Sequence, residues 1–198
     1  MPQRKMAAEA RWEFRVWAAN LVSVRRELER VGTVPGTTAS EETYLVSRAT
    51  DRSDAKVREG KLDLKVLLRE EQELEQWTPL LKAEFPLAAA LIRDQFFPPL
   101  AIDAPPLSKA EYSLDDFLGV VRAEPKIQIV NVLKERLKFD VLSCAAEFAA
   151  VKINGIARHT VAVESERPAQ LRKLIARLGI GPLGNTSYIR EIKHLAPE

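Results

Sequence analysis

Charged residues stand at every second position in several short segments of this chain of 198 residues. Side chains along a β-strand alternate between two faces, so each such segment would have one charged face and one mostly apolar face. The clearest segment places Arg11, Glu13 and Arg15 on one face and Trp12, Phe14 and Val16 on the other. The segments with this alternation are residues 11–17, 56–58, 61–66, 134–139 and 161–166. The pattern predicts antiparallel strands with a strongly charged surface.

Two arrangements of these strands satisfy the alternation. In the first, the charged faces meet water, which is the common arrangement for an antiparallel sheet with one face on a core. In the second, the charged faces turn inward around a polyanion, and helices cover the apolar faces. Charges gathered inside a barrel are costly unless a ligand or a metal ion balances them. The second arrangement therefore implies a binding site.

Composition limits the class of protein. Hydrophobic residues make up 46% of the chain and charged residues 29%, as in an ordinary globular protein that forms one domain. The net charge of +2 gives no global basic field, so no specific nucleic acid is predicted as a partner. A single cysteine, Cys144, excludes an internal disulfide and a cysteine-rich zinc site. Apolar runs are too short to span a membrane, and residues 1–10 lack the apolar core of a signal peptide, so we expect a cytoplasmic location.

The first half of the chain is predicted to form several strands, with one helix after the first strand and a helical region at its end. A helix is expected over residues 18–31 from the spacing of its apolar residues, followed by a loop at residues 33–40. Strands follow at residues 43–49, 55–60 and 62–68. A helical region is then expected from Arg69 to about Leu91, broken at its prolines, with Thr78 as an N-cap.

The second half repeats the strand-rich organisation after a proline-rich loop at residues 97–107. Ser113 opens a short helix in the manner of a capping box. Asn154-Gly155 joins two of the later strands and is a strong signal for a hairpin. A helix then begins at Pro168 and ends at Gly179, and a last helix covers residues 186–195. Strands grouped with single helices predict an α+β protein on a curled antiparallel sheet.

Six short charged motifs and a final Ser-Tyr pair follow one another in a recognisable order. They are Arg11-x-Glu13-x-Arg15, Lys56-Val57-Arg58, Leu62-Asp63-Leu64-Lys65, Arg69-Glu70-Glu71-Gln72-Glu73, Lys134-Glu135-Arg136, Glu164-Ser165-Glu166 and Ser187-Tyr188. Their order resembles that of the triphosphate tunnel metalloenzymes, or CYTH domains, which include class IV adenylate cyclases and thiamine-triphosphatases. The resemblance implies an antiparallel β-barrel with a charged interior and helices packed outside. It also implies one domain over residues 1–198, with a helical and proline-rich insertion at about 69–125.

The resemblance further implies a site and a function. The expected activity is metal-dependent hydrolysis of inorganic triphosphate, a nucleoside triphosphate or thiamine triphosphate inside a basic tunnel, with Mg²⁺ or Mn²⁺ as cofactor. Two alternatives stay open on the same fold: a module that binds a polyanion or nucleotide without catalysis, and a class IV-like adenylate cyclase. A homodimer is also open. The expected metal ligands are Glu13, Glu164 and Glu166, and the expected phosphate-binding residues are Arg15, Lys56, Arg58, Lys65, Lys134 and Arg136. No catalytic residue is assigned.

One departure from the family pattern affects the metal site. Arg11 stands where the family has the first glutamate of its N-terminal motif, and Arg15 stands in place of lysine. We expect the change at Arg11 to lower metal affinity or to remove one of two metal sites. His159 and His194 are expected to have structural or solvent-facing roles. The acidic run Glu70, Glu71, Glu73 and Glu75 is expected on a solvated helix face.

Overall fold

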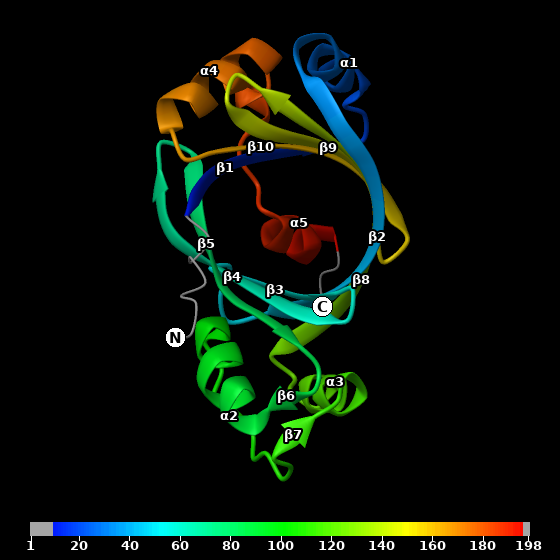
Figure 1. Ribbon diagram of the computed structural model, residues 1–198, viewed down its shortest axis with the longest axis vertical. Helices are drawn as coiled ribbons and strands as arrows, with labels where there is room; N and C mark the ends of the chain where they lie inside the picture. The colour runs from blue at the N-terminus through cyan, green and yellow to red at the C-terminus, as the bar shows by residue number, and fades with distance from the viewer. Residues whose placement is uncertain (1–9, 196–198) are drawn as a thin grey trace, which may run out of the picture.

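The computed structural model describes residues 10–195, apart from the side chains of residues 34 and 35. Eight strands form a closed barrel in the order β1-β10-β9-β8-β2-β3-β4-β5, and every neighbouring pair is antiparallel (Figure 1). The predicted fold class is therefore confirmed. The strands are β1 (Arg11–Ala18), β2 (Thr33–Ser47), β3 (Ser53–Arg58), β4 (Lys61–Glu71), β5 (Leu74–Glu84), β8 (Ile127–Val141), β9 (Cys144–Ile153) and β10 (Ile156–Ser165).

Helices and short connecting elements complete the chain, and most of them lie outside the barrel (Figure 1). Helices α1 and α4 lie together on one side, and the segment between β5 and β8 packs on the opposite side. These elements are α1 (Val22–Val31), β6 (Leu87–Ala88), α2 (Ala89–Leu91), the π-helix Ile92–Phe96, the 3-10 turn Pro98–Leu100, β7 (Glu111–Tyr112), α3 (Leu114–Arg122), α4 (Pro168–Leu178), the 3-10 turn Gly181–Leu183 and α5 (Tyr188–Leu195). No helix within residues 10–195 is long and apolar enough to cross a membrane.

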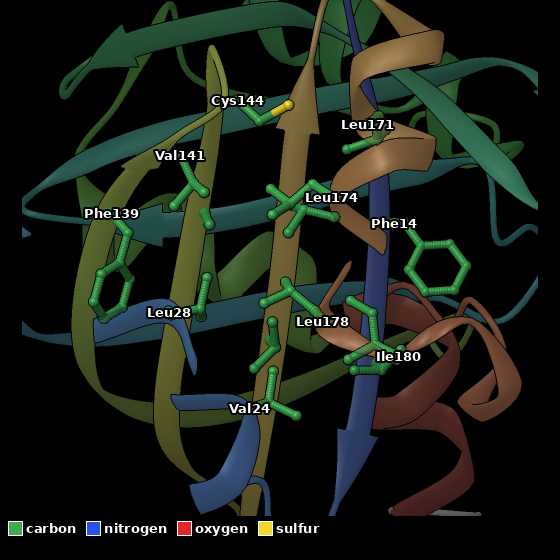
Figure 2. Close-up of a cluster of buried hydrophobic side chains, with 14 of the residues drawn as sticks. Phe14, Val24, Leu28, Phe139, Val141, Cys144, Leu171, Leu174, Leu178 and Ile180 are labelled. Carbon is green, nitrogen blue, oxygen red and sulfur yellow. The ribbon is translucent and has the colours of Figure 1, made fainter. Parts of the chain in front are cut away.

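The apolar faces of the alternating strands lie under helices, as the inward arrangement of the charges requires. Phe14 of β1 is buried in one cluster with Leu28 of α1 and Leu174 of α4 (Figure 2). On the other side, Leu62 and Leu64 of β4 belong to a second buried cluster that includes residues of α3 and the π-helix. The two outer cores therefore fix which face of each strand points into the barrel.

Helix α5 is an exception to the expectation that helices pack outside, because it lies within the ring of strands (Figure 1). Its residues Tyr188, Ile189 and Ile192 pack against inward-facing side chains of β2, β8 and β9. The segment before α5 runs beside β1, where Thr186 N donates to Arg15 O at 2.8 Å and Arg15 N donates to Asn185 Oδ1 at 2.7 Å. This end of the barrel interior is apolar, so a helix with one apolar face can fill it.

The predicted helix beginning at Arg69 is wrong. Residues 61–84 form the hairpin of β4 and β5, and Gln72 and Glu73 make its turn with φ values of 48° and 67°. Pro79 lies within β5 beside a register shift, where a strand tolerates proline because the ladder is already interrupted. The helical part of the insertion therefore begins after Glu84 rather than near residue 69. The predicted loop at residues 33–40 is also wrong, since it is the first half of β2, paired with β8.

Several local predictions are confirmed. Asn154 and Gly155 form the turn between β9 and β10, with φ values of 45° and 87°. The Ser113 hydroxyl accepts a hydrogen bond from Asp116 N at the start of α3. Gly179 ends α4 in the left-handed conformation, at a φ of 65°. At each of these positions a local residue preference agrees with the tertiary structure.

Candidate functional site

A polar cavity of about 350 Å³ lies inside the barrel, beyond the part that α5 fills. Eight of the nine residues predicted for the site line it, because they occupy the inward positions of five different strands. The predicted residues that line the cavity are Glu13, Arg15, Lys56, Arg58, Lys65, Lys134, Arg136 and Glu164. The charged faces of these strands therefore turn inward, and the alternative arrangement, in which they face water, is wrong for these strands.

Glu13 and Glu164 form a carboxylate pair across β1 and β10. They are directly opposite in the register, and Arg15 Nε donates to Glu13 Oε1 at 2.8 Å. Burial raises the pKa of Glu13, but Arg15 and Lys65 outweigh it and hold the pKa below its usual value. Burial, followed by the neighbouring Glu13, raises the pKa of Glu164 above its usual value. The pair thus combines a stable anion with a carboxyl group that accepts a proton readily.

Glu166, which we expected on the inner face with Glu164, lies at the rim of the barrel. Strand β10 ends at Ser165, so the strict alternation of faces stops before this residue. The Glu166 side chain is 54% exposed, and its Oε1 lies 3.9 Å from Arg11 NH2. Arg11, at 52% exposed, is likewise outside the cavity. Arg11 therefore faces Glu166 rather than Glu13.

The donor set fits a divalent ion only in part. Among residues 10–195, no group of three or more histidine, cysteine, aspartate or glutamate side chains is close enough to hold a metal ion by itself. Glu13 and Glu164 supply two carboxylates. Mg²⁺ can be held by one or two carboxylates when substrate phosphates and waters complete its shell. The residues present therefore fit a metal ion that binds together with a phosphate ligand.

Glu42 is a central residue that the sequence prediction missed. It lies on the inner face of β2 and is fully buried among four of the predicted cations. Its carboxylate is 2.8 Å from Lys134 Nζ, 3.3 Å from Arg136 NH1, 3.7 Å from Arg58 NH1 and 3.9 Å from Lys56 Nζ. Burial opposes ionisation, but Lys134 and Lys56 outweigh it and lower the pKa of Glu42 to about 2.

Lys134 is the most deeply buried of the predicted lysines. Its Nζ donates to the Tyr44 hydroxyl at 2.7 Å and lies 3.7 Å from the centroid of the Tyr188 ring. Burial and the neighbouring Lys56 lower the pKa of Lys134 to about 7, although Glu42 acts in the opposite direction. Arg15 also lies over the Tyr188 ring, at 4.4 Å from its centroid. Helix α5 thus contributes an aromatic surface to the cation cluster.

Other acidic residues also differ from their predicted roles. Asp54 and Glu147 line the cavity although no motif marked them. Glu75, expected on a solvated helix, is a buried strand residue whose carboxylate accepts from Trp77 Nε1 at 3.0 Å and Arg190 NH1 at 2.9 Å. Burial raises the pKa of Glu75. Glu75 and Trp77 are two residues apart, so a strand would place both on the same face. This spacing could have predicted the placement of Glu75 if the segment had not been predicted as a helix.

The remaining residues of the acidic run and the two histidines lie outside the cavity. Glu70, Glu71 and Glu73 are exposed, and Glu70 pairs with Arg190. His159 is half-buried beside the Phe148 ring, at 5.2 Å between centroids, and His194 is exposed. Neither histidine lines the cavity.

Comparisons with known proteins identify the fold. No family model and no curated protein matches the sequence. Among solved structures, the PH1012 protein of Pyrococcus horikoshii OT3 is similar, with a TM-score of 0.53, 15% identity and coverage of 89% of this chain and 97% of that chain. A candidate adenylate cyclase of Bacillus halodurans gives a TM-score of 0.52 and 12% identity, over 90% of this chain and 95% of that chain. These likenesses confirm the fold alone, a closed antiparallel barrel of the kind that the resemblance to the CYTH domains implied.

Proposed function

We propose that this protein binds the triphosphate group of a small molecule in the barrel cavity and hydrolyses it with the help of Mg²⁺ or Mn²⁺. The observation that carries the proposal is the inward convergence of six cationic side chains from β1, β3, β4 and β8 on one cavity. A triphosphate has several negative charges near neutral pH and needs cations held apart at separate oxygens. Arginine suits such oxygens because its planar guanidinium can make two parallel contacts.

The carboxylate pair is the part of the site suited to the metal ion. Glu13 and Glu164 would hold it together with phosphate oxygens of the substrate. When bound, the ion supplies charge neutralisation at the phosphoryl group and helps to orient the attacking water. Glu13 is kept ionised by Arg15, so it is available as an anionic ligand at neutral pH.

Hydrolysis requires that water attack the terminal phosphorus while the bridging oxygen leaves with the rest of the substrate. The water must lose a proton, which an ionised carboxylate in the cavity can accept; the raised pKa of Glu164 applies to the protein without metal, because a bound cation would lower it. Arg136 and Lys134 are suited to balance the charge on the phosphates during this step. Positioning and charge stabilisation together account for most catalysis of phosphoryl transfer.

A binding module without catalysis is the second candidate. It is favoured by Arg11, which stands where the family has a glutamate, and by the rim position of Glu166. Both features reduce the number of carboxylates at the cavity. An adenylate cyclase on this fold would also need a specific site for the adenine base, which no motif of the sequence identifies.

Two assays test the proposal. Phosphate release from inorganic triphosphate, nucleoside triphosphates and thiamine triphosphate is measured with Mg²⁺ and with Mn²⁺, beside an assay for cyclic AMP. Calorimetric titration measures binding in the same solutions. Lys65→Met should weaken binding, whereas Lys173→Met, which removes an exposed lysine of α4, should not. Binding without phosphate release would support the non-catalytic module, and absence of binding by every triphosphate would contradict the proposal.

A further inference from the structure

Glu42 lies behind the cavity wall and contacts cations that the proposed ligand would use. Its carboxylate lies within 4 Å of Lys134, Arg136, Arg58 and Lys56, which come from β8 and β3 on either side of β2. These are four of the six cations expected to bind phosphate. In the free protein, four of the six cations therefore already contact one internal carboxylate. Arg58 also pairs with Asp63 at 2.9 Å and Lys56 with Asp54 at 3.5 Å, so Glu42 is the nearest carboxylate only for Lys134 and Arg136 among the residues described.

The balance of charge around the cavity agrees with this pairing. The residues that line the cavity include seven lysines and arginines and five aspartates and glutamates, and Glu42 adds a carboxylate behind them. A buried group of cations without a counter-ion would repel and move apart, which a buried carboxylate prevents. A carboxylate a few ångströms from an incoming phosphate also repels it, because charges interact strongly in a partly desolvated site.

We propose that Glu42 is an internal counter-ion that holds these four cations in place and competes with the ligand for them. The identity of the ligand in this proposal rests on the proposed function. The competition between Glu42 and a polyanion for the four cations does not. Glu42 does not act on the reacting atoms and is a positioning residue. Neutralising it has two opposite effects: the free fold loses stability, and the affinity for polyanions increases. A residue with only a structural role would produce the first effect without the second.

The test compares Glu42→Gln with Glu41→Gln. Glu41 is the preceding residue of β2, is exposed, and points to the outer face, so the control removes the same charge from the same strand. Binding of inorganic triphosphate is measured by calorimetric titration without metal ion, at fixed salt and pH. Glu42→Gln should bind at least about tenfold more tightly than the wild type, the effect of a free-energy change of about 1.4 kcal/mol. Glu41→Gln should bind like the wild type. Equal or weaker binding by Glu42→Gln would overturn the proposal.

A second measurement separates the failure of this inference from a failure of the proposed function. Sulfate stabilises a folded protein that binds it, by an amount that grows with sulfate affinity. The increase in thermal stability with sulfate concentration should be larger for Glu42→Gln than for Glu41→Gln, whether or not any variant binds triphosphate. If both variants respond equally, Glu42 does not compete with anions. Should Glu42→Gln fail to fold, Glu42→Asp draws the carboxylate back from the cations, and its sulfate response should exceed that of the wild type; an equal response would overturn the proposal.

Discussion

Glu13 of β1 and Glu164 of β10 lie directly opposite each other on the inner face of the barrel. Like charges at directly opposite positions of an antiparallel pair destabilise a sheet. Arg15 and Lys65 relieve this repulsion in part, and the raised pKa of Glu164 shows that repulsion and burial are not fully balanced. Paired carboxylates with pKa values displaced in opposite directions are typical of functional sites.

The first prediction separates Glu164 from Glu166. Glu164→Gln should lower metal-dependent phosphate release by about 100-fold or more, because it removes a carboxylate that would hold the ion and could accept the proton of the attacking water. Glu166→Gln should have a much smaller effect, because the Glu166 side chain is half-exposed at the rim. Phosphate-release rates under identical metal and substrate concentrations decide this. Glu73→Gln serves as the surface control, and equal losses for Glu164→Gln and Glu73→Gln would contradict the assignment.

The second prediction concerns Arg11. Arg11→Glu removes the guanidinium that faces Glu166 and adds a carboxylate two residues before Glu13 on the same strand face. The affinity for Mn²⁺ in the absence of triphosphate should rise by about tenfold, because a further oxygen ligand adds to the mouth of the cavity. The free energy of unfolding should change by less than about 1 kcal/mol, as expected for a half-exposed ion pair.

Calorimetric titration with Mn²⁺ measures the effect of Arg11→Glu. Arg26→Glu makes the same charge change on the exposed face of α1 and should leave Mn²⁺ affinity unchanged. An unchanged affinity for Arg11→Glu as well would mean that position 11 lies too far from Glu13 and Glu164 to share a metal ion with them.

The alternation of charge was sufficient to predict five of the strands that line the cavity, β1, β3, β4, β8 and β10, but not which way their charged faces turn. Lys56 and Lys65 would show the same alternating pattern on an open sheet with its charged face in water. The pattern belongs to a single strand, whereas closure of the barrel depends on the pairing of all eight strands. The family resemblance predicted that the charged faces turn inward. The structure gives the physical reason: Phe14 and Leu62, on the opposite faces of their strands, are buried in apolar clusters with the outer helices.

The main errors arose where local composition disagreed with the tertiary pairing. Thr33–Ser40 has the composition of a loop, so the strand was predicted to begin at Thr43 and Glu42 was left out of the alternation. The turn at Gln72 and Glu73 contains no glycine, although both residues have positive φ, so nothing marked a hairpin there. The position of α5 inside the barrel could not be predicted either, because an amphipathic helix does not specify which apolar surface it covers.

The third prediction tests the outer core beneath α4. Leu171 is fully buried in the cluster that includes Phe14 and Leu174 (Figure 2). Leu171→Ala should lower the free energy of unfolding by about 2–5 kcal/mol, through lost burial and the cavity that remains. Lys173→Ala, on the exposed side of the same helix, should change it by less than about 0.5 kcal/mol. Urea denaturation of both variants decides this, and similar values for the two would contradict the packing of α4.

The last prediction concerns the pH dependence that Lys134 confers. Its pKa is about 7 in the folded protein, whereas a lysine of an unfolded chain titrates near ~10.4. Between these two values the unfolded chain binds more protons than the folded one, so the contribution of Lys134 to the free energy of unfolding rises with pH. The groups that face Lys134 are Glu42 and Tyr44 of β2, Lys56 of β3, Glu147 of β9 and Tyr188 of α5.

Lys134→Met removes this titration while keeping a side chain of similar length. Measured by urea denaturation without ligand, the wild type should gain stability relative to Lys134→Met as the pH rises from about 7 to about 10, at up to about 1.4 kcal/mol per pH unit. Lys173→Met should follow the wild type, because Lys173 is exposed on α4. A difference between wild type and Lys134→Met that does not change with pH would mean that Lys134 keeps an ordinary pKa. Glu42 and the Tyr188 ring would then offset the burial of Lys134 and its repulsion by Lys56 more completely than a pKa of about 7 implies.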